Sequence, residues 1–510
     1  MIPSEWLPVA IIITPLVTGF LLIPLGPYTS KKFQGFFATI ASFLTFVFTV
    51  LLFLKVIDGT IVIHKMAGWK APFGIVLVVD ALNGFVTMVV VGIVMLATVY
   101  SIEYMKHDTG LSYYYSLLML MLSGMVGVTL TGDLFNLFVF LEIASIAAYG
   151  LVAFRLTELD PLEAGFKYCI MGAVATSFIL LAIGLLYGLL GTVNMADMAE
   201  KLKTGNFLYG AKNGNIILPI ILAVLIWGFG IKAAVVPMHT WLPDAHPAAP
   251  SPISAILSGV FIKVGVYAMI RVLFTIYGIQ PGNCLLFYVM TFGVITMVFA
   301  GFLALAQSDV KRMLAFSSIM NIGYILFGVG IGNFLGLVGG LFHLLNHAIL
   351  KALLFLAAGS IIHQTGIRDM RQLGGLGRKM PITLTVFVIG GFGIAGVPPL
   401  NGFVSKWIIF KAAIETGQPI LIFYVVMGVV MSAVAVAYIV NALRNIFFGE
   451  SKIDLENVEE SPPLMLIPMV ILSAMVVILG IFPQFGFNLV EPAVKATVFP
   501  ASYIHQVLGG

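Results

Sequence analysis

The sequence predicts an all-α polytopic membrane protein with about fourteen transmembrane helices. Two observations support that prediction. Of the 510 residues, 60% are hydrophobic and only 9% are charged, whereas a soluble domain carries about 25% charged residues. Apolar stretches of roughly 18 to 28 residues follow one another along the chain, and each is long enough to cross about 30 Å of hydrocarbon as a helix.

The apolar windows place the helices in order along the chain. The predicted ranges are 5–24, 33–55, 76–104, 112–131, 134–154, 164–191, 216–247, 250–277, 284–306, 311–331, 333–363, 381–416, 420–447 and 463–483. The N-terminus lacks the basic start and the small-residue cleavage site of a signal peptide, so we expect the first helix to be retained.

Two of these helices are predicted to be broken. The seventh contains Pro237 and Pro243, and the twelfth contains Pro398 and Pro399. Proline removes a backbone donor and clashes with the preceding turn. At membrane depth such a break survives only where protein or water satisfies the freed carbonyl groups.

The breaks also indicate an internal repeat. The segment before the first break reads GFGIKAAVVP, and the segment at the second reads GFGIAGVPP. Five helices separate them, and an odd offset reverses orientation, so helices 4–8 and 9–13 form an inverted pair that is typical of transport sites. Gly-Phe-Gly is also common in membrane helices, so chance similarity is the alternative. The predicted segments are 1–110 (three helices), 111–280 and 281–450 (the two repeats), and 451–510 (the last helix and tail).

The sequence contains no pattern for redox or nucleotide chemistry. The only cysteines, Cys169 and Cys284, form no CxxC or Cys/His cluster, which argues against an iron–sulfur or zinc site. Neither a GxGxxG nor a GxxxxGK[ST] pattern is present. We therefore expect no cofactor, no metal, no nucleic-acid partner and no redox catalysis by this chain.

Five charged residues fall where the chain should pass through the middle of the membrane. They are Glu142, Lys232, Lys263, Lys351 and Lys406. A charge at the centre of a lipid-facing helix costs about 2.5–3.5 kcal/mol even on the most lenient insertion scale. Charged residues are therefore rare at the centre of membrane helices unless they have a function, and these five suggest a path for protons or ions.

Glu142 and Lys232 are the first candidates for proton exchange. Burial favours the neutral form of each group, while a nearby opposite charge favours the ionised form. A lysine balanced between these effects gains or loses a proton when a neighbour moves. A structural ion pair is the alternative interpretation.

Histidines extend the candidate path. His239 follows Pro237, and imidazole can donate and accept a proton near neutral pH; alternatively, it is a hydrogen-bonded part of the break. His343, His347 and Lys351 are spaced by four and line one helical face. A proton relay is our interpretation, with packing or a divalent metal as alternatives, although the lysine on that face would repel a cation. Lys406, after the second break, would be the far terminal.

The basic residues predict the orientation. With the N-terminus outside, cytoplasmic loops carry thirteen basic residues and the opposite side carries nine, which favours both termini outside an inner (plasma) membrane. The thirteen are Lys31, Lys32, Lys106, Arg155, Lys167, Lys311, Arg312, Arg368, Arg371, Arg378, Lys379, Arg444 and Lys452. Asp80 and Lys167 begin predicted helices, and we interpret them as helix-end residues that reach toward water, with a role in water access as the alternative.

Five passages resemble a known family. They are FLEIASIAAYGLVAF around Glu142, KAAVVPMHTWLPDAHPAAPSPISAILSGVFIKVGVY from Lys232 to Tyr267, QSDVKRMLAFSSIMNIGY, HLLNHAILKALLFLAAGSI and GVPPLNGFVSKW. The chain is similar to the antiporter-like subunits of Mrp-type cation/proton antiporters, respiratory complex I and membrane-bound hydrogenases. Lysine at position 406 agrees best with the Mrp D-type and hydrogenase-type members.

The resemblance implies fourteen helices, the inverted repeat and a proton path. It also implies that Glu142 pairs with Lys232, that Lys263 and a histidine of the eleventh helix connect the halves, and that the partners are other membrane subunits, the bilayer, H⁺ and possibly Na⁺. A stand-alone secondary transporter of a small solute is the alternative. A scaffold whose polar residues only join helices is a third hypothesis.

Overall fold

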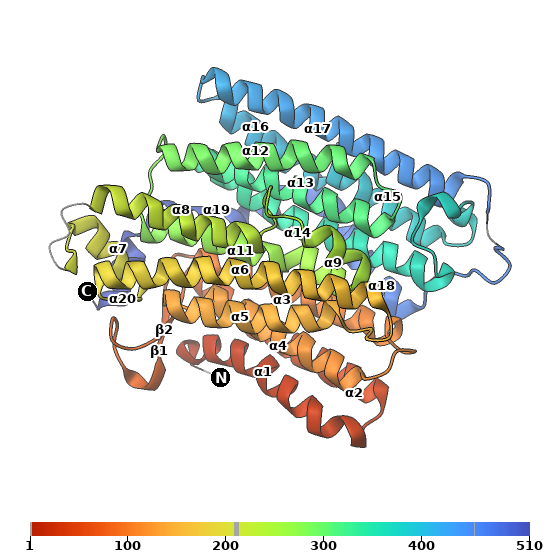
Figure 1. Cartoon of the computed structure of the whole chain (residues 1–510), viewed down its shortest axis with the longest axis horizontal. Coiled ribbons are helices and arrows are strands. Elements are labelled where there is room, and N and C mark those ends of the chain that lie inside the picture. The colour runs from red at the N-terminus through yellow and green to blue at the C-terminus, as the bar shows by residue number, and fades with distance from the viewer. Residues whose placement is uncertain (1–2, 209–213, 453, 510) are drawn as a thin grey trace.

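The computed structural model describes residues 3–208, 214–452 and 454–509. Within these residues the chain is mainly helical, and twelve helices are long and apolar enough to cross a membrane. Two shorter apolar helices, Ile217–Lys232 and Pro381–Ala395, accompany them. Figure 1 shows the long helices lying side by side along one common direction. The prediction of a multi-pass helical membrane protein is confirmed.

The helices follow the predicted order. Those of the first half are α1 (Leu7–Leu25), α2 (Lys31–Val56), α3 (Ala81–Tyr104), α4 (Leu111–Leu130), α5 (Leu134–Val152), α6 (Leu159–Leu190), α7 (Met195–Thr204), α8 (Gly214–Lys232), α9 (Leu242–Ala248), α10 (Ser251–Ile256) and α11 (Ile262–Ile270). Those of the second half are α12 (Cys284–Leu305), α13 (Val310–Ile331), α14 (Phe334–Thr365), α15 (Pro381–Ala395), α16 (Asn401–Ile414), α17 (Pro419–Leu443), α18 (Pro463–Ile481), α19 (Gln484–Val498) and α20 (Ala501–Leu508).

Short polar side chains start several of these helices. Asp133, Asp309 and Asn333 accept hydrogen bonds from the first free backbone N–H groups of α5, α13 and α14. Such caps satisfy donors that have no partner inside the helix. Gly191 and Gly366 end α6 and α14 in the left-handed conformation that glycine adopts without steric cost.

Residues 76–79 are not helical, so the prediction of a helix from residue 76 was wrong there. They form β2 (Val76–Val79), which pairs antiparallel with β1 (Val62–Lys65), with Val62 opposite Val79. The run of β-branched residues favours a strand. Asp80 then caps α3: its side chain accepts a hydrogen bond from Asn83 N, and the Asn83 side chain accepts one from the backbone N–H of Asp80. The helix therefore begins at Ala81.

The break in the seventh predicted helix begins earlier than expected. α8 ends at Lys232, five residues before Pro237, and Pro243 stands in the first turn of α9, where proline is tolerated. Side chains satisfy the exposed backbone groups. The indole of Trp241 donates to Ile231 O at 2.9 Å, and Val236 N donates to the hydroxyl of Thr296 on α12 at 3.1 Å.

The second break separates α15 from α16. α15 ends at Ala395, Gly396 has a φ of 87°, and α16 begins at Asn401. A Cβ on Gly402 would collide with the carbonyl oxygen of Gly393, so glycine is required where the two half-helices approach. The Val236–Pro237 and Pro398–Pro399 peptide bonds are both cis.

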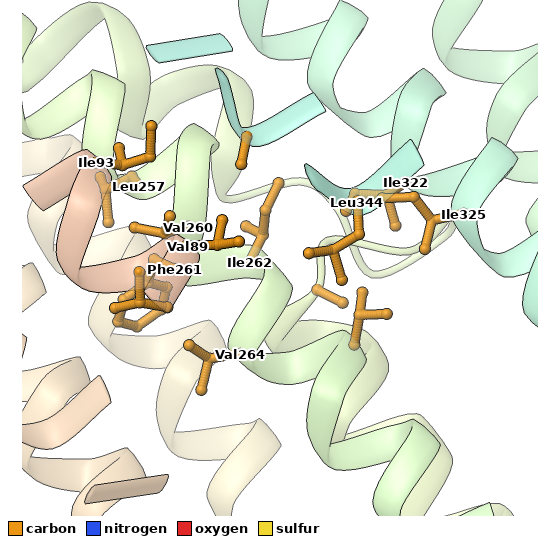
Figure 2. Packing of buried hydrophobic residues seen from close by; sticks show 14 of the residues in the cluster. Val89, Ile93, Leu257, Val260, Phe261, Ile262, Val264, Ile322, Ile325 and Leu344 are labelled. Carbon is orange, nitrogen blue, oxygen red and sulfur yellow. The ribbon is translucent and has the colours of Figure 1, made fainter. Parts of the chain in front are cut away.

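The centre of the molecule is the stretch Ser251–Ile276, every residue of which is buried. It is continuous through α10, a π-helical segment (Leu257–Phe261), α11 and a second π-helical segment (Arg271–Ile276). Figure 2 shows Leu257, Val260 and Phe261 packed near Val89 and Ile93 of α3. Helices farther out expose apolar side chains such as those of Phe20, Leu54 and Leu181, as expected for contact with lipid.

Candidate functional site

Glu142 and Lys232 meet at the first break. The ammonium of Lys232, at the end of α8, lies 3.6 Å from Glu142 Oε1 on α5. It also donates to the hydroxyl of Ser145 at 2.7 Å and to that of Tyr149 at 3.2 Å. The side chain of Lys232 is 2% exposed and that of Glu142 is 29% exposed. Three oxygens on one helix therefore surround a buried ammonium.

A series of aromatic contacts leads from Lys232 to Trp241. The ring of Tyr149 lies below the ammonium, with the nitrogen 5.7 Å from its centroid. Tyr168 packs edge-on against Tyr149, and its other neighbour, Trp241, stacks on it at 4.1 Å. Since Trp241 also caps α8, the same side chain that stabilises the break supports the ion pair.

Lys263 lies in the middle of the buried central stretch, on α11. Its ammonium donates to the carbonyl oxygen of Ser258 in the neighbouring π-helical segment. The hydroxyl of Ser258 is within 2.6 Å of the Ser318 hydroxyl on α13. Gly265 allows the close approach of α11 to α8, because a Cβ there would touch the backbone around Lys232. Lys232 and Lys263 thus stand on adjacent elements, although the described contacts do not join their side chains.

The polar face of α14 is fully buried. The ring nitrogens of His343 hydrogen-bond to the Ser405 hydroxyl at 2.9 Å and to Asn321 Oδ1 at 3.1 Å. His347 stacks parallel to His343 with centroids 6.2 Å apart, and neither of its ring nitrogens has a hydrogen-bond partner. Lys351, one turn further on, donates to Leu314 O at 3.1 Å. The predicted shared face is therefore present.

Lys406 is held by the end of a helix. Its ammonium donates to Ile394 O and Ala395 O, at 3.0 and 3.1 Å, and to the Ser432 hydroxyl at 3.3 Å. The two carbonyl groups end α15, where the helix carries partial negative charge. The ring of Tyr324 lies 4.5 Å from the nitrogen. Among the described residues no carboxylate forms an ion pair with Lys406, unlike Lys232.

His239 lies apart from these groups. It packs beside Phe299 and Phe316 in the first break, and its Nδ1 has no hydrogen-bond partner. Of the two histidines near the first break, His246, seven residues later, is the one that has lysines nearby. It is fully buried, stacks on Phe355 at 4.5 Å and interacts electrostatically with three of them. The sequence analysis placed His239 near the break and did not single out His246.

Three buried charges escaped the sequence analysis. Lys311, assigned to a cytoplasmic loop, is 2% exposed and donates to Ala249 O. Asp80 does not reach toward water. It is 3% exposed and forms a two-pronged ion pair with Arg271, at 2.7 and 2.9 Å. That pairing joins residues 191 positions apart, so no local pattern indicates it. Lys167 is a surface residue that bonds to Glu163 and Asp244.

Lys263 of the first half and the buried lysines and histidines of the second half act on one another electrostatically. The coupled residues are Lys263, His343, His347, Lys351 and Lys406. Two unit charges about 8 Å apart repel by about 2 kcal/mol at an effective dielectric constant near 20. A proton gained by one lysine therefore discourages a proton on its neighbours. The described residues contain no group of three or more His, Cys, Asp or Glu that could hold a metal ion.

Comparison with known proteins identifies the family. The profile described as "NADH:quinone oxidoreductase/Mrp antiporter, TM" matches residues 131–432, and "NADH-Ubiquinone oxidoreductase (complex I), chain 5 N-terminus" matches residues 66–115. NADH-quinone oxidoreductase subunit N of Desulforudis audaxviator is 34% identical over 94% of this chain and 96% of its own. The chain belongs to the NADH:quinone oxidoreductase/Mrp antiporter family.

Other members of the family match along nearly the whole chain. The D-type Na⁺/H⁺ antiporter protein of Bacillus subtilis is 30% identical over 98% of both chains. A chain of the Mrp complex from Dietzia sp. DQ12-45-1b superposes with a TM-score of 0.89 at 26% identity, covering 100% of both chains. A chain of the membrane-bound sulfane sulfur reductase, an archaeal respiratory membrane complex, superposes with a TM-score of 0.88 at 31% identity. The match covers 98% of this chain and 100% of that chain. The predicted family membership is confirmed.

Proposed function

We propose that this chain is a proton-translocating, antiporter-like subunit of a multisubunit ion-pumping complex. The observation that carries the proposal is the buried ammonium of Lys232, 3.6 Å from Glu142 and directly before a helix break. Ionisable groups inside a membrane are costly and mark ion pathways. This chain moves H⁺. Na⁺ is a second cation, which the complex exchanges for H⁺ through this chain or through other subunits.

The proposed path joins the two breaks through the central helices. It runs through Glu142, Lys232, Lys263, His347, His343, Lys351 and Lys406, with His239 beside the first break. Protonation alternates between Lys232 and Lys406. When Glu142 moves away, Lys232 loses the charge that stabilises its ammonium and passes on a proton. Repulsion among Lys263 and the lysines and histidines of the second half then displaces a proton near Lys406.

The two halves share features that support the inverted repeat of helices 4–8 and 9–13. The third helix of each half, α6 and α14, is 32 residues long. Each second helix begins with an aspartate cap, and backbone bridges join Asp133 to Asn194 and Asp309 to Asp369, just beyond those third helices. Counting α8 with α9 and α15 with α16 as broken crossings gives fourteen.

We propose that both termini lie outside the plasma membrane. The pocket lined by Glu5, Trp6, His64 and Gln506 brings the N-terminus, the β1–β2 hairpin and α20 to one end of the bundle, and Figure 1 shows β1, β2, α7 and α20 there. Most loop lysines and arginines belong to the other end, which is the cytoplasmic one by charge. The partners are other membrane subunits, as in the Mrp and sulfane sulfur reductase complexes.

The test is proton uptake by the intact complex in sealed vesicles, expressed per assembled complex. We expect Lys232→Ala and Glu142→Ala each to abolish uptake while the complex still assembles. The first substitution removes the group that exchanges the proton, and the second removes the charge that stabilises the Lys232 ammonium. Lys411→Ala is the matched control, since Lys411 is an exposed lysine on α16. Pumping retained in both variants contradicts the proposal. Solute uptake by the purified single chain would favour a stand-alone transporter instead.

A further inference from the structure

His343 differs from the other buried histidines because both of its ring nitrogens have hydrogen-bond partners. Nδ1 lies 2.9 Å from the Ser405 hydroxyl on α16, and Nε2 lies 3.1 Å from Asn321 Oδ1 on α13. His246 and His347 are also completely buried, but neither ring nitrogen of either residue has a partner among the described residues. The partners of His343 therefore determine where its ring carries a hydrogen.

The side-chain amide of Asn321 fixes a hydrogen on Nε2 of His343. The amide nitrogen, Nδ2, donates to the carbonyl oxygen of Ser317 at 2.7 Å. The opposite orientation would place two acceptor oxygens against each other, so the amide oxygen faces His343. Because that oxygen only accepts, Nε2 must donate and must carry a hydrogen. The neutral ring then has its lone pair on Nδ1, which accepts the hydrogen of the Ser405 hydroxyl.

The Ser405 hydroxyl has a second set of acceptors at the start of α16. The carbonyl oxygens of Gly402 and Asn401 lie 3.2 and 3.4 Å from Ser405 Oγ. A hydroxyl group has one hydrogen and two lone pairs, so it donates either to His343 Nδ1 or to a carbonyl oxygen. When Nδ1 itself carries a hydrogen, Ser405 Oγ accepts it and the hydroxyl hydrogen turns to Gly402 O. Each protonation state of the ring thus has a complete set of hydrogen bonds.

The surroundings of the ring make these hydrogen bonds necessary. His343, Asn321 and Ser405 are all 0% exposed. Figure 2 shows the apolar side chains of Ile322 and Leu344, which follow Asn321 and His343 in the chain, close to one another where α13 packs against α14. A polar group that is buried without a partner is unfavourable, and a charged group more so. Protein groups must therefore satisfy this ring in both of its states.

We propose that Ser405 is the positioning residue that lets His343 take up a proton at Nδ1, a role that rests on the function proposed above. The Ser405 hydroxyl first turns from Nδ1 to Gly402 O, which uncovers the lone pair. One proton of the path adds to that lone pair, and the ring becomes an imidazolium. The new N–H donates to Ser405 Oγ, whose own O–H bond stays intact. Loss of the proton reverses these steps.

Four titratable groups face the His343 ring from the elements packed around it. Lys406 on α16 and Lys263 on α11 interact with it electrostatically. The Tyr324 ring on α13 lies 5.6 Å away, and the His347 ring on α14 lies 6.2 Å away, as measured between centroids. A charged ammonium disfavours a second positive charge nearby. His343 therefore takes up its proton most readily when Lys406, the residue after Ser405, is neutral.

Serine variants test this role in the intact complex, by proton uptake in sealed vesicles over a range of pH. Ser405→Ala removes both the acceptor of the charged ring and the donor of the neutral ring. The charged state loses more, because charge-assisted hydrogen bonds are roughly twice as strong as neutral ones. We expect the pH profile of the rate per assembled complex to move to lower pH by at least about half a unit. Ser405→Thr keeps the hydroxyl and should restore the profile.

Ser123→Ala is the matched control for the serine variants. The Ser123 hydroxyl is also buried and donates to a backbone carbonyl oxygen on another helix, that of Ile12, at 3.0 Å. Its pH profile should be that of the wild type. An unchanged profile in Ser405→Ala, or a rate that falls equally at every pH, overturns the role of Ser405. If Lys232→Ala abolishes uptake while Ser405→Ala keeps the wild-type profile, the proposed function stands and only this role fails.

Nitrogen NMR of the histidine-labelled complex tests the hydrogen positions without measuring transport. The signals of His343 are identified by their loss in His343→Gln. We expect the neutral ring to carry its hydrogen on Nε2, with a bare, hydrogen-bonded Nδ1, and the ring to carry hydrogens on both nitrogens at lower pH. A neutral ring with its hydrogen on Nδ1 overturns the proposal, because Ser405 would then accept from the ring in both states.

Discussion

The buried lysines share one unusual property: most of them bond to backbone carbonyl oxygens rather than to carboxylates. The pairs are Lys263 with Ser258, Lys311 with Ala249, Lys351 with Leu314, and Lys406 with Ile394 and Ala395. A carboxylate stabilises the ammonium far more than the amine, whereas a carbonyl accepts a hydrogen bond from either. These hydrogen bonds therefore provide acceptors for the ammonium groups without an opposite charge. Among the buried lysines that the structure describes, Lys232 is the one that forms an ion pair with a carboxylate, that of Glu142.

An arginine at position 406 can distinguish a need for positive charge from a need for proton exchange. Arginine supplies a permanent positive charge that does not lose its proton. We expect Lys406→Arg to leave the complex assembled but to abolish proton translocation in sealed vesicles. Lys411→Arg, on the exposed side of the same helix, should translocate normally. Wild-type rates in Lys406→Arg would show that position 406 needs only a charge.

At the scale of elements, the two breaks depend on partners from other helices. After Lys232 the backbone N–H groups of Ala233, Ala234 and Val235 still bond back into α8. Beyond them Val236 N donates to Thr296 of α12, and Ile231 O accepts from the indole of Trp241. At the second break the loose carbonyl groups of α15 are taken by Lys406 of α16. The first break is thus stabilised by neutral groups, and the second by the ammonium group of Lys406.

The Thr296 contact has a measurable contribution to stability. Thr296→Val keeps the shape of the side chain but leaves Val236 N buried without an acceptor, which costs about 1–3 kcal/mol. We expect a lower thermal unfolding temperature of the purified protein in detergent. Thr45→Val is the control, because the Thr45 hydroxyl bonds only within its own helix, to Ala41 O. An equal effect of both substitutions would mean that the break does not need Thr296.

At the scale of the whole molecule, the two halves share a plan but differ in charge. Helices at the centre are buried throughout, whereas α1, α2, α6 and α17 expose apolar side chains on the outside. The carboxylate of the first half has no counterpart beside Lys406 among the described ion pairs. An asymmetric pair of sites in a similar framework suits transfer in one direction, since the two ends respond differently to the same proton.

The orientation of the molecule is open to direct measurement. In a Cys169→Ser, Cys284→Ser background, we expect Lys70→Cys to react with a membrane-impermeant maleimide added to intact cells. Lys379→Cys should react only after permeabilisation, because it lies at the end rich in basic residues. Both positions are exposed. The reverse pattern would place the termini inside the cell.

Much of the architecture follows from the sequence, and the exceptions have physical causes. Hydropathy located the long helices, because lipid requires about 20 apolar residues in a row. It missed β1–β2 and started α3 too early, since four valine and leucine residues of a strand look like the beginning of an apolar helix. It also assigned Asp80 to the membrane surface and Lys311 to a loop, because a charge near a helix end resembles a residue that reaches water.

The sequence alone determined the class of the molecule, the order of its long apolar helices and the two regions in which a helix is broken. Composition and proline fix these properties locally, without reference to distant residues. The family resemblance already implied that Glu142 pairs with Lys232. Only the tertiary structure decided that Asp80 meets Arg271, that Lys406 meets the end of α15, and that His246 rather than His239 has lysines nearby. Electrostatic interactions depend on separation in space, and in this chain the decisive neighbours lie on different helices.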